Sequence, residues 1–288
     1  MLSHLLGTAI ISRQLTYLAL MLCAIGPRMA LSQTPSPLQE WQYPGGVMLE
    51  QLFEPNLEWR FVLGAAVVTE PLYDGSRRYR VEPGPVIDIR YRDIAFASVG
   101  EGLGVNILRG ENYRAGVAIG YDLGRPVSDD PSHLNGLGNI SAAPFIKLYE
   151  SYVISKQFPL DVRADVRRIV GGAGGLLGDL QAFMPLPGSS KTLFMLAGPS
   201  ITFSDRQYTQ KVFGVSDTQA AASGYRGYAA HGGLTAAGLG FSATHFITPG
   251  WLINADVAAN RLLGSASNSP ITQTSFQGIV ELTTAYQW

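Results

Sequence analysis

The segment Leu160-Asp-Val-Arg-Ala-Asp-Val-Arg167 alternates apolar and charged residues without a break. Side chains on a β-strand point to opposite faces at period two, so the segment predicts a strand with one apolar and one charged face. The charged face holds Asp161, Arg163, Asp165 and Arg167. Such a row fits the solvent face of a soluble two-sheet sandwich, or the polar interior of a barrel in lipid.

The same alternation recurs at 113–122, 251–260 and 280–288. In each segment an aromatic residue ends the apolar row, and the opposite row is polar or small with few charges. Aromatic residues at the rims of an apolar outer face are typical of a barrel in lipid. We therefore predict a polar lumen lined by Arg114, Asp161, Arg163, Asp165, Arg167, Asp256 and Glu281. The charges on 161–167 either line an ion path or pair with one another as a plug.

Composition favours the barrel over the soluble sandwich. Of the 288 residues, 46% are hydrophobic and only 15% are charged, whereas an ordinary soluble domain has about 25% charged residues. The chain also has 33 Gly and 13 Tyr, which suit many short strands joined by turns. A formal net charge of −1 and the lack of a polybasic run argue against a nucleic-acid partner.

The fold class that we predict is all-β: a transmembrane, antiparallel, up-and-down β-barrel of about 12 strands. The expected strands are 57–68, 84–91, 94–99, 102–108, 113–122, 139–149, 158–170, 175–185, 191–203, 233–246, 250–262 and 276–288. If 94–99 and 102–108 are one kinked strand, the alternative is ten. The long connections 69–83, 123–138, 204–232 and 263–275 then all lie on the outer side of the membrane.

The N-terminal region reads as an export signal. A basic residue, an apolar run of about 11 residues and small residues near Ser32 indicate a signal peptide at 1–32. We expect a periplasmic segment at 33–56 and the barrel at 57–288. The only cysteine, Cys23, lies in the signal, so neither a disulfide nor a thiol nucleophile is expected.

The chain shows no spacing typical of a catalytic site, a metal site or a cofactor site, and we expect none of the three. His133 and His231 fall in expected outer loops, where a solvated histidine is the ordinary interpretation. Gly171 to Gly175 lacks the Lys-Ser/Thr ending of a phosphate loop. The cluster Arg77-Arg78-x-Arg80 suits either lipopolysaccharide or a solvated charge run.

Several segments, taken in order, are similar to one known family. They are Pro71-Leu-Tyr-Asp-Gly-Ser-Arg-Arg-Tyr-Arg-Val-Glu-Pro83, Gly102-Leu-Gly104, Gly124-Arg125, Leu134-Asn-Gly-Leu-Gly138, Phe203-Ser-Asp205, Phe213-Gly-Val-Ser216 and Arg261-Leu-Leu-Gly264. In combination they resemble the MipA/OmpV family of outer-membrane proteins. Two features depart from the family pattern: Arg77 and Arg78 stand where acidic residues are expected, and the chain ends in Trp288 rather than Phe.

The resemblance implies a scaffold in the bacterial outer membrane rather than an enzyme. It implies a barrel surrounded by lipid and lipopolysaccharide, with a lytic transglycosylase and a penicillin-binding protein as periplasmic partners in murein synthesis and hydrolysis. Within the segment 33–56, Trp41, Tyr43 and Phe53 are the side chains that we expect to contact a partner. A small-solute channel is the alternative function, and an outer-membrane hydrolase is the third.

Overall fold

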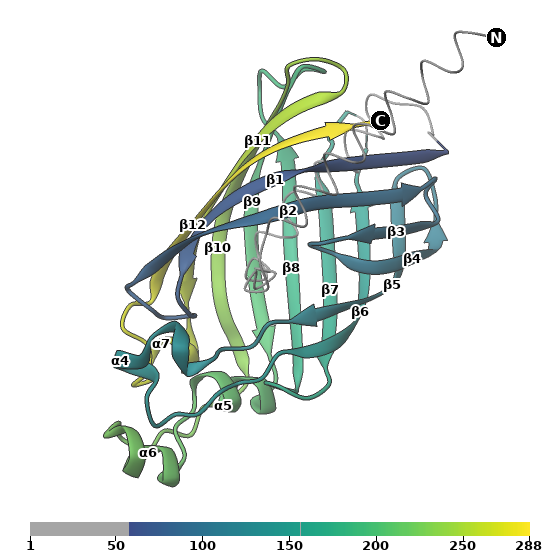
Figure 1. The fold of residues 1–288 in the computed structure, drawn as a ribbon. Helices are drawn as coiled ribbons and strands as arrows, with labels where there is room; N and C mark the ends of the chain where they lie inside the picture. The colour runs from purple at the N-terminus through teal and green to yellow at the C-terminus, as the bar shows by residue number, and fades with distance from the viewer. Residues whose placement is uncertain (1–57, 156) are drawn as a thin grey trace, which may run out of the picture. The chain divides into compact units, whose positions relative to one another are not determined.

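The computed structural model describes residues 58–155 and 157–288. In this part of the chain, twelve antiparallel strands form one closed barrel (Figure 1). They are β1 (Trp59–Pro71), β2 (Tyr79–Tyr91), β3 (Ala95–Ser98), β4 (Gly102–Arg109), β5 (Tyr113–Asp122), β6 (Ala143–Val153), β7 (Asp161–Ile169), β8 (Leu176–Pro185), β9 (Leu193–Ser204), β10 (Gly233–Phe246), β11 (Trp251–Leu262) and β12 (Phe276–Gln287). Each strand pairs with its neighbours in sequence, and β1 closes the barrel on β12 from Val62↔Gln287 to Thr69↔Val280.

The predicted up-and-down barrel of twelve strands is confirmed, and the ten-strand alternative is wrong. Several bounds differ from the prediction, among them the starts of β2 and β6. Strand β2 begins at Tyr79 instead of residue 84, because Pro83, a residue type common in turns, lies within the strand and does not end a loop. Strand β6 begins at Ala143 rather than residue 139, because Ile140 belongs to the preceding loop, where it forms an isolated bridge with Arg125.

The outer face of the barrel is apolar between two sets of aromatic side chains. At the end where β1 begins and β12 ends, which we call the terminal end, Trp251 contacts Tyr286, and Tyr286 contacts Trp288, with ring centroids 5.2 and 5.0 Å apart. Exposed aromatic residues near the opposite end are Tyr79, Tyr121, Phe203 and Phe276. This arrangement matches the surface that a barrel presents to lipid. Among the described residues, no helix is both long and apolar enough to cross a membrane.

The opposite end, which we call the loop end, carries the long connections, and these contain short helices (Figure 1). The helices are η1 (Val127–Asp129), α4 (Pro131–Leu134), α5 (Arg206–Phe213), α6 (Asp217–Ser223) and α7 (Gly264–Ser267). The sequence pattern predicted loops here, since elements of three to eight residues are too short to show helical periodicity. Helix α6 is fixed by a capping box between Ser216 and Gln219 and ends at Gly224, whose φ is 78°.

Two clusters of buried side chains hold these connections together as an ordered cap. One cluster includes Val212 and Phe213 of α5 together with Leu262 of β11. The other joins Tyr73 of the β1–β2 loop to Leu134 of α4 and to Ile271. The loops therefore pack on one another across the chain, and they close the loop end around a cavity described below.

Candidate functional site

The charged face that the sequence predicts for 160–167 lies on β7, and all four of its charged side chains are buried. Asp161, Arg163, Asp165 and Arg167 have exposed fractions between 0% and 7%. Because a single-layer barrel exposes its outer face, buried side chains of its strands face the interior. Ser151 donates a hydrogen bond to Asp161 over 2.7 Å. These charges are paired with neighbouring groups rather than arranged around open water.

The centre of the charged network is Glu101, in the tight turn between β3 and β4. One of its carboxylate oxygens accepts from Arg163 of β7 at 2.7 Å, and the other accepts from Arg90 of β2 at 2.7 Å. Arg90 also binds Asp88 on its own strand, at 2.9 Å. Glu101 therefore ties the short β3–β4 hairpin to β7 and β2 through the barrel interior.

A second group of charges lies next to it on β7 and β8. Arg167 pairs with Asp179 of β8 and with Asp165, the latter at 3.2 Å. Thr202 of β9 donates to Asp179 at 2.5 Å. The buried ammonium group of Lys147 lies 5.9 Å from the ring centroid of Tyr149. Buried ions are tolerated when they are paired and hydrogen-bonded, and Arg167 and Asp179 meet this requirement through each other and through Thr202.

The remaining predicted lumen residues lie in other parts of the interior. Arg114 is half-buried and pairs with Asp93 of the β2–β3 turn. Asp256 and Glu281 are buried and stand opposite each other on β11 and β12, and Thr283 donates to Glu281 at 2.9 Å. Arg114 stands opposite Ser151, which donates to Asp161, so Arg114 adjoins the charges of β7, whereas Asp256 and Glu281 form a separate group. The three predicted partner residues, Trp41, Tyr43 and Phe53, lie outside the described residues.

Sequence reasoning missed several members of the network. Asp179 and Gln181 occupy the buried row of β8, and the alternation of 176–185 was signal enough to find them. Glu101 lies in a turn, where no alternation assigns a face, so its inward position had no local signal. The arginine cluster also differs from expectation, because Arg78 pairs with Asp130 at 2.9 Å and Arg80 pairs with Glu70 at 2.7 Å.

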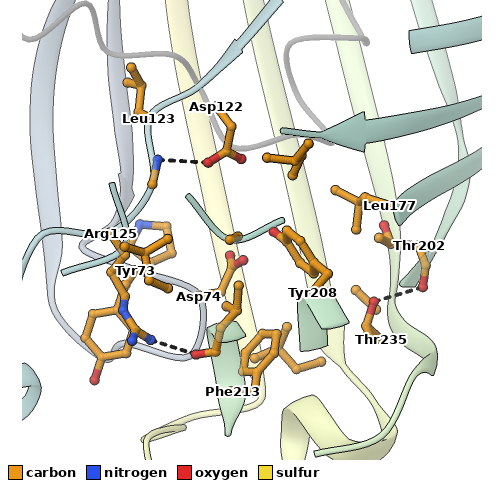
Figure 2. A pocket seen from close by; sticks show the side chains of 18 of the residues that line it. Tyr73, Asp74, Asp122, Leu123, Arg125, Leu177, Thr202, Tyr208, Phe213 and Thr235 are labelled. Atoms are coloured by element: carbon orange, nitrogen blue, oxygen red, sulfur yellow. Dashed lines mark hydrogen bonds between the residues drawn. The ribbon is translucent and has the colours of Figure 1, made fainter. Parts of the chain in front are cut away.

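The loop end encloses a cavity of about 210 Å³ between the cap and the ion network (Figure 2). Its lining combines apolar side chains such as Leu177 and Phe213 with the carboxylates of Asp74 and Asp122. Arg125 lines it as well and donates to the carbonyl oxygen of Val212 at 2.7 Å. The cavity is thus mostly apolar with a few polar groups, which is the usual make-up of a small-molecule site.

Two polar groups at this cavity make no hydrogen bond with another described residue. In the described part of the chain, neither the carboxylate of Asp74 nor the hydroxyl of Tyr208 makes a hydrogen bond, and both residues line the cavity (Figure 2). Burial raises the pKa of Asp74, and the charge of Asp122 raises it further, while Arg125 opposes both. Burial also raises the pKa of Tyr208. Both groups therefore face the cavity in an environment that disfavours a free negative charge.

The loops also bring a serine, a histidine and an aspartate together beside α4. Ser132 donates to Asp130 at 2.6 Å, and both Ser132 and Asp130 contact Nδ1 of His133 at 3.0 Å. A catalytic relay needs the serine and the carboxylate on different ring nitrogens. Because Ser132 and Asp130 share one ring nitrogen, these contacts stabilise the loop and do not form a hydrolytic triad.

Comparisons with known proteins agree with the barrel. The family model described as MltA-interacting protein MipA matches residues 63–288. No curated protein matches the chain significantly. Among solved structures, the CymD monoaromatic hydrocarbon channel is 10% identical, with 91% of this chain and 94% of that chain covered and a TM-score of 0.42. The NanC porin is 7% identical, with 78% and 98% covered and a TM-score of 0.39.

The toluene transporter TbuX of Ralstonia pickettii is 12% identical, with 84% of this chain and 93% of that chain covered and a TM-score of 0.35. Structural likeness at this level carries no argument about function. The family model, in contrast, covers most of the barrel, and the apolar outer face with its two aromatic sets suits the outer membrane. The chain belongs to the MipA family of MltA-interacting proteins and is a β-barrel of the bacterial outer membrane.

Proposed function

We propose that the barrel is an outer-membrane interaction protein for enzymes of murein synthesis and hydrolysis. The observation that carries the proposal is the packed interior, because it sets this barrel apart from a wide pore. Lys147, Phe183 and Gln181 are each no more than 2% exposed, although all lie on barrel strands. A barrel filled by its own side chains acts through its rims and loops rather than through a water channel.

The partner class follows from the family. Its description names an interaction with MltA, so a lytic transglycosylase is the partner that we propose, together with a penicillin-binding synthase. Both would meet the barrel at its terminal end, since short turns and chain termini of such barrels face the periplasm. We propose that the segment 33–56, with Trp41, Tyr43 and Phe53, supplies contacts there.

The size of the available surface supports this assignment. A stable interface buries about 800 Å² on each partner. At the terminal end the β2–β3 turn spans only residues 92–94, although the β8–β9 connection spans 186–192. Turns of this length supply a small part of such an area. A partner would therefore need the N-terminal segment in addition to the turns.

The test is copurification of a lytic transglycosylase with the full-length barrel from detergent-solubilised envelopes. We expect deletion of residues 33–52, behind an intact signal, to leave a folded barrel and to reduce the captured enzyme at least tenfold. A matched replacement of the same residues by a Gly/Ser linker controls for length. Unchanged capture by both variants would remove the segment from the interface, and no capture by the wild type would contradict the scaffold.

A channel is the competing function, and the packed interior makes a definite prediction about it. Purified barrel in a planar bilayer should give no steps of the size seen with open porins. Large, regular conductance steps would show that the charged network of Glu101, Arg163 and Arg167 opens in the membrane. That result would favour the channel over the scaffold.

A further inference from the structure

The wall of the barrel between β2 and β5 is continuous only in its terminal half. There β2 pairs with β3 from Asp88 to Tyr91, and β4 pairs with β5 as far as Leu103↔Ile119. Among the described residues, no backbone pairing joins 79–86 of β2 to 120–122 of β5. We call the space between these two segments the lateral break. Lipid offers no partners for unpaired backbone groups, so a strand edge left open in it must be adapted.

The sequence of β2 carries such an adaptation. The carbonyl of Ile87 accepts from Val99 of the β3–β4 turn, so odd-numbered residues of β2 direct their backbone groups away from β1. Pro83 and Pro85 share this parity and have no N–H to leave unpaired. Two of the donors that would face the break are therefore missing. Pro83, which ended the expected connection 69–83, is thus one of the two prolines that make an open edge tolerable.

The lateral break lies at the height of the apolar outer face. The exposed rings of Tyr79 and Tyr121 mark the loop-side rim of that face on both flanks of the break. On the side of the terminal end, the break is limited by the β3–β4 turn, which Glu101 holds in place. On the side of the loop end, the break is limited by helix η1, because Asp129 of η1 pairs with Arg80 of β2 at 3.5 Å. The break is thus a bounded opening in the half of the wall nearer the loops.

The cavity at the loop end reaches both flanks of this break. Its lining includes Arg80 from β2 and Tyr121 from β5, in addition to Asp74 and Tyr208 inside. Space is also open beside β2, since a Cβ added at Gly84 would meet nothing within 4 Å. A site with two free polar groups and an apolar lining therefore lies behind an opening that faces lipid.

From this arrangement we propose that the loop-end cavity binds a small organic cation with an aromatic or alkyl body, which enters from the membrane through the lateral break. The proposal is independent of the murein partner. A dry protein cavity of about 150 Å³ holds a benzene molecule, so about 210 Å³ suits one ring with a short amine chain. The ammonium group would bind the carboxylate of Asp74 and the hydroxyl of Tyr208, and the ring would pack on Phe213 and Leu177.

The charge of the ligand follows from the lining. Arg125 donates to the carbonyl of Val212, and Arg80 pairs with Glu70, whereas Asp74 makes no hydrogen bond or salt bridge among the described residues. Arg125 acts on Asp74 only through space, and the charge of Asp122 opposes the ionised form of Asp74. An entering cation would supply the hydrogen-bonded counter-charge that this carboxylate lacks among the described residues. Aromatic rings such as Phe213 add a favourable cation–π contribution.

The site is tested by calorimetry on the full-length barrel in detergent, with three probes of equal size. We expect phenethylamine to bind at least tenfold more tightly than 2-phenylethanol and phenylacetate. Asp74→Asn should weaken phenethylamine at least tenfold, and Tyr208→Phe should weaken it less. Asp217→Asn makes the same chemical change in α6, away from the cavity, and should change nothing. Equal affinity for the three probes, or no binding of any of them, would overturn the site.

The route is tested by the rates of the same binding reaction, measured by stopped flow on barrel in lipid vesicles. Gly84→Phe should place a ring beside the lateral break and slow association and dissociation by the same factor, at least fivefold, with the equilibrium constant unchanged. Gly84→Ala is the matched control and should leave both rates as in the wild type. Unchanged rates in Gly84→Phe, with a barrel shown to be folded by its gel mobility before boiling, would overturn entry through the break.

Discussion

The wall formed by β6 to β8 and the wall formed by β2 to β5 use the same alternating pattern, yet only the first is paired over its full height. Strand β6 is paired with β7 from Phe145↔Ile169 to Val153↔Asp161. On the other side β3 has only four residues, and its turn ends half-way along β2. The comparison shows that closure of a barrel and continuity of its wall are separate properties. Closure is fixed by backbone pairing from β1 to β12. The place where the wall stops between β2 and β5 is fixed by an interior side chain, Glu101.

The largest expected effect concerns that side chain. Glu101→Ala removes the carboxylate shared by Arg90 and Arg163, and removal of one partner from a buried ion pair costs about 3–5 kcal/mol. The free energy of unfolding, from urea titration of barrel in vesicles, should fall by that amount. Glu101→Gln keeps an acceptor of the same shape and should lose less. Equal, large losses would show that the negative charge of Glu101, and not its shape, holds the hairpin, and negligible losses in both variants would contradict the role given to Glu101.

The next effect contrasts the outer faces of the two walls. Leu148 is 59% exposed near the middle of β6, where an outward arginine costs about 2–4 kcal/mol. Val81 is 65% exposed but lies near the rim beside the lateral break, where the cost is about 0–1 kcal/mol. Urea unfolding of Leu148→Arg and Val81→Arg should therefore differ by at least 1 kcal/mol. Equal losses would mean that Val81 faces the centre of the bilayer.

A smaller effect is expected at the open edge itself. Pro85→Ala adds an N–H that faces the lateral break without a backbone partner, and an unsatisfied donor costs about 1–3 kcal/mol. We expect a loss at the lower end, about 1 kcal/mol in unfolding free energy. Val81→Ala truncates a side chain on the same edge but adds no donor, and it should be close to neutral. An unfolding free energy raised by Pro85→Ala would show that the added N–H finds a partner and that the edge is closed.

The smallest effect belongs to the cap. The pKa of Asp74 is raised in the folded protein, so its contribution to stability is complete below the ordinary carboxyl pKa near about 4 and is lost as pH rises through the raised value. Asp74→Asn has no carboxyl group to ionise, so the variant does not lose this stability as pH rises. Thermal unfolding should show the variant more stable than the wild type at pH 7.5, and the difference should shrink at pH 4. A constant difference would mean that Asp74 stays ionised throughout.

The sequence predicted the strands whose two faces differ and failed where other forces decide the structure. Alternation on 160–167 placed Asp161 and Arg163 on one face, and both are buried. The sequence pattern puts Pro83 in the connection 69–83, because nothing local shows that a strand has an open edge. Glu101 was missed because turns have no period. The cap helices and the cavity depend on contacts such as Tyr73 with Ile271, almost 200 residues apart, and no local pattern encodes them.

The central claim, that the wall is interrupted between β2 and β5, is tested most directly by amide hydrogen exchange. The backbone groups of Val81 and Ile89 have the same parity on β2, but Ile89 faces Ala97 of β3 whereas Val81 faces the lateral break. Residue-resolved exchange in lipid vesicles or nanodiscs should show Val81 exchanging at least a hundredfold faster than Ile89. Equal protection of the two amides would show that the wall is continuous and would contradict the account.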